Sequence, residues 1–183
     1  MYGVNAPYPV LVGEAELVVE IGSGMGEATA AMAAASPQVV LLAVEVQPAG
    51  VAALLRRLEE QNLANVRVAR DDAVLVLEAL LPSSVAEVRV FFPDPWPKAK
   101  HAKRRLVRPD FTALVASRLA PGGRLHLATD VGGYTEHALQ VLADGWTASV
   151  VARPAHRPVT RFEQQGLDAG RSISDIYAYP VRA

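Results

Sequence analysis

The sequence predicts an α/β fold with a doubly wound, mostly parallel sheet of seven strands and helices on both faces. Three observations support this fold class. Short apolar runs alternate with helical segments, a glycine-rich turn follows the first run, and prolines or glycines bound many of the segments. Apolar runs of about four to eight residues between turn residues are typical of strands buried on both faces.

The seven predicted strands are short and rich in β-branched residues, and they span residues 17–21, 39–46, 66–69, 88–92, 124–128, 146–152 and 173–179. Apolar spacing, alanine content and prolines at helix starts predict helices over residues 27–35, 48–61, 74–81, 109–119 and 133–143. Residues 1–14 hold two glycines and two prolines and are expected to form a loose N-terminal segment. We expect one domain across residues 1–183.

Composition narrows the class of protein. With 183 residues, 51% apolar and 20% charged, the chain is large enough to bury a full core. The absence of cysteine excludes disulfides, thiolate metal sites and a cysteine nucleophile. The four histidines show no ligand spacing, so no metal is expected. No apolar run approaches the ~20 residues that cross a bilayer, which predicts a cytoplasmic protein without a membrane partner.

Residues 91–105, FFPDPWPKAKHAKRR, join an apolar strand to a carboxylate and then to a dense positive run. Three prolines surround Asp94 and Trp96, remove backbone donors and stiffen the loop. Residues 98–108 carry six Lys or Arg and no acid, which leaves 12 basic and 19 acidic residues elsewhere, a net charge of about −7. A basic island on an acidic body favours one local polyanion contact. The alternative is a proline-rich connector with a solvated basic face.

A glycine turn connects the first predicted strand to the first predicted helix. Gly22, Gly24 and Gly26 would let the backbone pass close to a nucleotide-like ligand. A GxGxG pattern alone is a weak signal, since a tight turn is the alternative. The dinucleotide fingerprint has a further glycine where this chain has Glu27, whose charge would repel a pyrophosphate. The turn therefore favours a ligand without phosphate.

Four acids follow or end the first four predicted strands: Glu20, Glu45, Asp72 and Asp94. Ligands of open α/β sheets bind along the edge where these strands end. There Glu45 can accept from ribose hydroxyls, and Asp72 can accept from an adenine amine or cap the next helix. Four acids with almost no basic residue beside them suggest a cationic ligand, and S-adenosylmethionine, with its sulfonium and amino groups, fits.

Five motifs together carry a resemblance to a known family: VEIGSGMG at 19–26, FPDPWPK at 92–98, HAKRR at 101–105, ATD at 128–130, and TRFEQQG at 160–166 followed by SDIYAY at 174–179. With these motifs the chain resembles the bacterial tRNA guanine-N(7) methyltransferases, a class I family with a Rossmann-like fold. The segment before Glu20 is shorter than is usual in that family.

The resemblance implies roles for particular residues. Cofactor contacts would come from Glu20, Gly22, Gly24, Gly26, Glu45, Asp72 and Asp94, with Asp94 at the catalytic position. Substrate contacts would come from Lys98, Asp130, Thr160, Arg161, Phe162 and Glu163, and RNA contacts from Lys100, His101, Lys103, Arg104 and Arg105. It also implies S-adenosylmethionine as methyl donor, S-adenosylhomocysteine as product and tRNA as partner. Both a monomer and a homodimer stay open.

Three other interpretations remain at this point. The same fold could methylate a small molecule or another RNA, could use a nicotinamide cofactor, or could serve as a non-catalytic RNA-binding module. Glu27 and the row of acids argue against a nicotinamide cofactor, and the basic run argues against a small substrate. The proline-bracketed segment from Pro154 to Pro158 is predicted to be a loop long enough to fold over the pocket.

Overall fold

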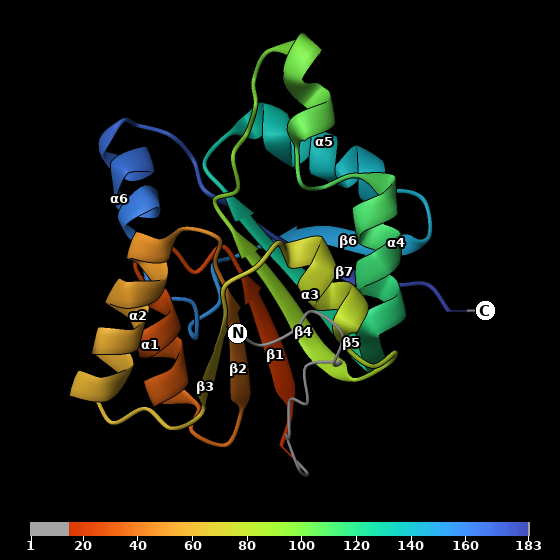
Figure 1. Cartoon of the computed structure of the whole chain (residues 1–183). Coiled ribbons are helices and arrows are strands. Elements are labelled where there is room, and N and C mark those ends of the chain that lie inside the picture. Colours follow the sequence, from red (N-terminus) through yellow and green to blue (C-terminus); the bar gives the residue numbers. More distant parts are fainter. Residues whose placement is uncertain (1–14, 183) are drawn as a thin grey trace.

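A computed structural model describes residues 15–182 and contains one seven-stranded sheet with the order β3-β2-β1-β4-β5-β7-β6 (Figure 1). The strands are β1 (Leu17–Ile21), β2 (Val40–Val44), β3 (Val66–Ala69), β4 (Val85–Phe91), β5 (Leu119–Thr129), β6 (Trp146–Val151) and β7 (Ser174–Pro180). Strands β1 to β5 pair in parallel, while β7 runs antiparallel to both β5 and β6. The predicted fold class is therefore confirmed.

The helices follow the strands in alternation: α1 (Glu27–Ala35), α2 (Pro48–Glu60), α3 (Ala73–Ala79), the 3₁₀ helix η1 (Ala99–Arg104), α4 (Pro109–Arg118), α5 (Gly132–Leu142) and α6 (Arg161–Asp168). The predicted helices match α1 to α5 to within about two residues. Neither η1 nor α6 was predicted, because both are short and lie in mostly polar stretches. The loose segment predicted over residues 1–14 lies outside the described residues.

Helices cover both faces of the sheet. The larger apolar core lies under α3, α4 and α5, where Val76, Phe111 and Leu142 are buried against Val88 and Leu125 of the sheet. On the other face, α1 and α2 cover β2 and β3 through a smaller cluster that includes Met32, Leu41, Leu54 and Val66. Figure 1 shows these two helix layers on opposite sides of the strands. Within residues 15–182, no helix is both long and apolar enough to cross a membrane.

The strands β4 and β5 are longer than predicted. β4 begins at Val85, and β5 begins at Leu119, so the predicted turn at Pro121 to Gly123 lies inside β5. A side chain at Gly123 would lie 2.9 Å from the Val85 carbonyl oxygen, which shows how closely the two backbones approach there. The pairing of β4 with β5 shifts register between Val85 and Glu87. The residues predicted to form a turn are therefore part of the irregular beginning of β5.

One face of the sheet carries polar side chains across four neighbouring strands. Glu20 pairs with Arg89, Arg89 with His126, and His126 with Tyr177. Directly paired residues share a face of the sheet, so these side chains lie in one row. Glu20 and His126 are buried although they can carry charge. Buried polar groups require partners, and Glu20 has one in Thr29 of α1 and His126 one in Asp175 of β7.

Candidate active site

The predicted glycine turn connects β1 to α1. Gly22, Gly24 and Gly26 have φ values of 78°, 55° and 78°, a left-handed backbone that side chains with a Cβ rarely adopt. A side chain at Gly26 would lie 2.8 Å from Cβ of Leu54, so this glycine also allows α1 to pack on α2. Nothing lies within 4 Å of the Cβ positions of Gly22 and Gly24. The turn therefore leaves open space at its first two glycines.

Glu45 follows β2 directly and holds this turn in place. Its Oε2 accepts a hydrogen bond of 2.8 Å from the Gly24 N–H, and its Oε1 accepts one of 2.8 Å from the Gln47 N–H. Each carboxylate oxygen keeps a further acceptor position. Gly50, in the first turn of α2, lies against the same turn, since a side chain there would be 2.5 Å from the Gly24 carbonyl oxygen.

These features fit a ligand with hydroxyl and amino groups. The hydroxyl of Ser23 is buried in the turn and has no hydrogen-bond partner among the described residues. The open side of Gly22 and Gly24 gives space, and the Glu45 carboxylate gives acceptors, so the donor and acceptor set suits a nucleoside. The chemistry of the turn is compatible with S-adenosylmethionine.

Glu20 lies inside β1 rather than beyond its end, and it is 3% exposed. Its Oε2 accepts a hydrogen bond of 2.6 Å from the Thr29 hydroxyl of α1. Burial raises the pKa of the Glu20 carboxyl, and the Thr29 hydrogen bond and the Arg89 charge oppose that rise without cancelling it. A cationic group beside Glu20 would favour its ionised form.

Asp72 precedes α3, and its Oδ1 accepts a hydrogen bond of 2.8 Å from the Val74 N–H. It is therefore the helix cap that the sequence offered as one of two alternatives. The proposed contact of Asp72 with an adenine amine stays a prediction.

The four predicted acids, Asp72, Glu45, Glu20 and Asp94, lie at or just beyond the ends of β3, β2, β1 and β4, which are neighbours in that order.

The loop after β4 carries Asp94 at the surface. Phe92 and Trp96 have φ values of 52° and 39°, an uncommon conformation for side chains of this size. The Arg105 guanidinium fixes the loop by donating to the Pro95 carbonyl at 3.1 Å and the Trp96 carbonyl at 3.3 Å. The exposed carboxylate thus sits on a loop held by the end of the basic run.

The basic run forms η1 and folds back against Trp96. The Arg104 guanidinium lies 4.9 Å from the centre of the Trp96 ring, and the His101 ring lies edge-on to it at 5.7 Å. Trp96 is half-buried by these contacts. Lys98, Lys100 and Lys103 are exposed, which leaves their ammonium groups accessible to an anion. Arg105, in contrast, is already engaged with the loop carbonyls.

The segment predicted to bind substrate begins at the cap of α6. The Thr160 hydroxyl accepts a hydrogen bond of 3.0 Å from the Glu163 N–H. Arg161 and Phe162 are exposed, whereas Glu163 is buried. Asp130, at the end of β5, accepts a hydrogen bond of 2.8 Å from Arg171. Figure 1 shows α6 and η1 at the same end of the sheet, where β1 to β5 end.

Comparisons with known proteins decide the family. A family described as "Putative methyltransferase" matches residues 14–176. The chain belongs to this methyltransferase family. A tRNA (guanine-N(7)-)-methyltransferase of Nitrosomonas europaea is 47% identical over 165 residues, which cover 87% of this chain and 74% of that protein. One of Streptomyces coelicolor is 50% identical over 168 residues, and the match covers 87% of this chain but 62% of that protein.

Solved structures agree on the fold of this methyltransferase. A SAM dependent methyltransferase from Aquifex aeolicus superposes with a TM-score of 0.62 at 17% identity, covering 94% of this chain and 88% of that one. An rRNA methylase from Streptococcus thermophilus gives a TM-score of 0.61 at 15% identity, covering 92% and 89%. The resemblance stated from the sequence is confirmed at the level of family and fold.

Sequence reasoning missed Arg157, which is fully buried in this methyltransferase. Its guanidinium donates to both carboxylate oxygens of Asp175 in β7, each at 2.7 Å, and it also donates to Glu163. Burial opposes the charge of Arg157, but these carboxylates outweigh burial and raise its pKa. Arg157 therefore anchors the start of α6 to the sheet.

Two local signals could have revealed other features that the sequence reasoning missed, namely the start of α6 and the close packing at Gly50. Thr160 and Glu163 have the spacing of a helix capping box, which predicts a helix start at α6. Gly50 lowers the helix propensity of an otherwise strong helical segment, which often marks a site of close packing. No local pattern marks Arg157, because its partners are 6 and 18 residues away in the sequence.

Proposed function

We propose that this protein methylates N7 of a guanine in tRNA, in its variable loop, with S-adenosylmethionine as methyl donor, in the cytoplasm. The family membership and the names of the relatives support this proposal. The observation that carries it is the pairing of an open glycine turn, held by Glu45, with an exposed carboxylate next to the lysines of η1. A cationic donor and an anionic RNA each find a matching surface at one end of the sheet.

Asp94 is proposed to position the reacting groups. When bound, S-adenosylmethionine supplies a methyl group on a positively charged sulfur. Guanine N7 carries a lone pair and no proton, so Asp94 need not act as a general base. The S–C bond breaks as the N–C bond forms, and S-adenosylhomocysteine leaves. A carboxylate at Asp94 would orient the base through its N–H groups and stabilise the positive charge that develops on the ring.

The direct test is incubation of the full chain with radiolabelled S-adenosylmethionine and an unmodified tRNA transcript, followed by digestion to nucleosides. We expect the label in 7-methylguanosine. Label in another nucleoside would instead favour a different RNA methyltransferase on the same fold. Binding of the transcript without any transfer would favour the non-catalytic RNA-binding module.

The first prediction concerns Gly50, which allows the glycine turn to approach α2. Gly50→Ala would place a methyl group 2.5 Å from the Gly24 carbonyl oxygen. Overpacking of such a site costs about 1–3 kcal/mol, so we expect S-adenosylmethionine affinity to fall by roughly tenfold or more. Isothermal titration calorimetry measures the affinity for S-adenosylmethionine. The matched control is Gly132→Ala in the first turn of α5, where nothing lies within 4 Å and affinity should not change.

The second prediction concerns the exposed lysines of η1. Lys100→Ala with Lys103→Ala should weaken tRNA binding and make its dependence on salt less steep. At ~0.7–0.9 per phosphate contact, the log–log slope should change by about 1.4–1.8 for two lost contacts. S-adenosylmethionine affinity should stay the same. Arg56→Ala with Arg67→Ala removes two exposed charges outside η1 and serves as control; equal slopes for the two double variants would contradict the prediction.

A further inference from the structure

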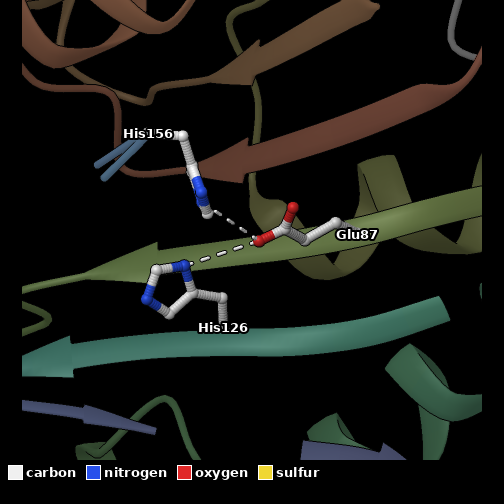
Figure 2. Close-up of side chains that lie close together, drawn as sticks. All are labelled: Glu87, His126 and His156. Carbon is white, nitrogen blue, oxygen red and sulfur yellow. Dashed lines mark ion pairs between the residues drawn. The ribbon is translucent and has the colours of Figure 1, made fainter. Parts of the chain in front are cut away.

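Three polar atoms from distant parts of the chain converge on the sheet face opposite α3 to α5. Glu87 Oε1 in β4 lies 3.4 Å from His126 Nδ1 in β5 and 4.0 Å from His156 Nε2, which is in the linker between β6 and α6. All three atoms lie within 4.8 Å of one another. Figure 2 shows the three side chains pointing toward one another. Each is buried and has no hydrogen-bond partner among residues 15–182. Buried polar atoms without partners are rare and require an explanation.

The other polar atoms of Glu87 and His126 are engaged. Glu87 Oε2 accepts hydrogen bonds from Arg89 at 3.0 Å and from Arg124 at 3.2 Å. His126 Nε2 lies 2.8 Å from Asp175 Oδ1. An ionised carboxylate only accepts hydrogen bonds, so Nε2 of His126 must carry a proton. In the neutral ring, His126 Nδ1 then presents a lone pair to Glu87 Oε1, and the two lone pairs repel unless a cation or proton lies between them.

A proton on His126 would satisfy one of these contacts but would leave His156 Nε2 without a partner. The guanidinium groups of Arg89 and Arg124, at 3.0 and 3.2 Å from Glu87 Oε2, favour the ionised form of this carboxylate. A neutral imidazole and an ionised carboxylate are the forms that ligate metals.

We propose that Glu87 Oε1, His126 Nδ1 and His156 Nε2 bind a divalent transition-metal ion of the zinc class. Two imidazoles and one carboxylate form a common zinc donor set, with the fourth position left to water. The outer partners also fit, since a ligating histidine usually donates its other N–H to a carboxylate, as His126 does to Asp175. The arginines that hold Glu87 Oε2 orient the carboxylate in the same way.

Zinc binding requires the three side chains to move slightly closer together. Ligand atoms around tetrahedral zinc lie about 3.3 Å apart, given Zn–N and Zn–O distances near 2 Å. The separation of Glu87 from His126 already matches. The His156 ring must move toward Glu87, from which it is 4.0 Å away, and toward His126, from which it is at most 4.8 Å away. A side-chain movement of up to about 1.5 Å therefore closes the site. His156 is on a linker and is 33% exposed, which gives the ion a route from solvent. The positive charges of Arg89 and Arg124 oppose a cation, so we expect weaker binding than at a zinc site without nearby positive charges.

Such an ion would tie the linker to the sheet. His156 precedes Arg157, and the linker leads directly to the cap of α6 at Thr160. Zinc bound by Glu87, His126 and His156 would add a second anchor beside Arg157 for the segment that carries the predicted substrate residues.

The test is titration of zinc chloride into the untagged full chain after removal of metals by chelation. We expect one ion per chain, and His156→Ala should weaken binding by tenfold or more. Glu87→Gln should weaken it as well, because the ligand loses its charge. His101→Ala, which removes a histidine outside the cluster, should bind zinc like the unaltered chain. Circular dichroism checks that each variant keeps its fold.

Cobalt(II) gives a second readout of the same site. Substitution with cobalt should produce the visible absorption bands of a four-coordinate ion, and His156→Ala should remove them. Failure of the unaltered chain to take up either metal would overturn the proposal, as would equal uptake by the His156→Ala variant. The measurement uses neither methyl donor nor tRNA, so its outcome is independent of the proposed function.

Discussion

Replacing Asp94 with alanine is expected to lower the rate of methyl transfer by about 10²–10³-fold, the loss typical when a preorganised electrostatic group is removed from an active site. Asp94 is exposed and lies three residues beyond the end of β4, so its removal should not disturb the core. Arg105 still holds the loop through the Pro95 and Trp96 carbonyls. Single-turnover transfer of a labelled methyl group to tRNA measures the rate, and circular dichroism checks the fold.

Two further variants show whether the charge of Asp94 matters. Asp94→Asn keeps the size of the side chain but removes its charge, and it should lose most of the activity that Asp94→Ala loses. Asp110→Ala removes an exposed carboxylate in the first turn of α4, where it pairs with Arg108, and it should transfer methyl groups normally. Near-normal turnover by Asp94→Ala would show that the proposed role is wrong.

Replacing Arg157 with methionine is expected to lower the free energy of unfolding by about 3–5 kcal/mol, because it leaves buried carboxylates without their counter-charge. Arg157 is fully buried between Glu163 and Asp175, and both carboxylates are themselves buried. Urea unfolding followed by circular dichroism measures the change. The matched control is Arg161→Met at the exposed start of α6, where a surface substitution should change stability by less than about 0.5 kcal/mol.

The pH dependence of stability gives a second readout for Arg157. Burial alone would raise the pKa of Asp175, but hydrogen bonds from His126 and Arg157 outweigh it and hold the pKa below the usual value. A carboxylate with a lowered pKa in the folded state stabilises the fold above its unfolded pKa of about 3.9, and this contribution disappears as the pH falls through the folded value. Arg157→Met should therefore lose less stability on acidification than the unaltered chain. If Arg157→Met lost as much stability as the unaltered chain on acidification, the proposed effect of Arg157 on the pKa of Asp175 would be wrong.

The sequence predicted the regular elements well because each has a local cause. Alternation of apolar runs with helical segments is a property of neighbouring residues, and the structure confirms five helices and seven strands near the predicted positions. The predictions failed for α6, since RFEQQGLD is short and mostly polar and its two large apolar residues, Phe162 and Leu167, are exposed. This helix depends on tertiary contacts instead: Glu163 is buried beside Arg157, and Gly166 allows close approach to Asp130.

The candidate site likewise has features that the sequence predicted and features that depend on tertiary contacts. The sequence predicted the glycine turn and the row of acids because parallel strands connected by helices bring their carboxyl ends to one edge. It did not predict that Glu45 would hold the turn through the Gly24 N–H, or that Arg105 would hold the loop next to Asp94. Those contacts depend on how a side chain bends back toward a backbone group, which residue spacing does not specify.

The amino-acid sequence alone determined the α/β class, the position of the glycine turn and the concentration of positive charge beside Asp94. These features follow from hydrophobic periodicity and local composition, which depend only on residues close together in the sequence. Only the tertiary structure decided which charged residues meet inside the protein. Glu87 and Arg124 are 37 residues apart, and His126 and Asp175 are 49 apart, yet strand order makes them neighbours. Burial then forces such groups to pair, since an isolated charge in the core costs several kcal/mol.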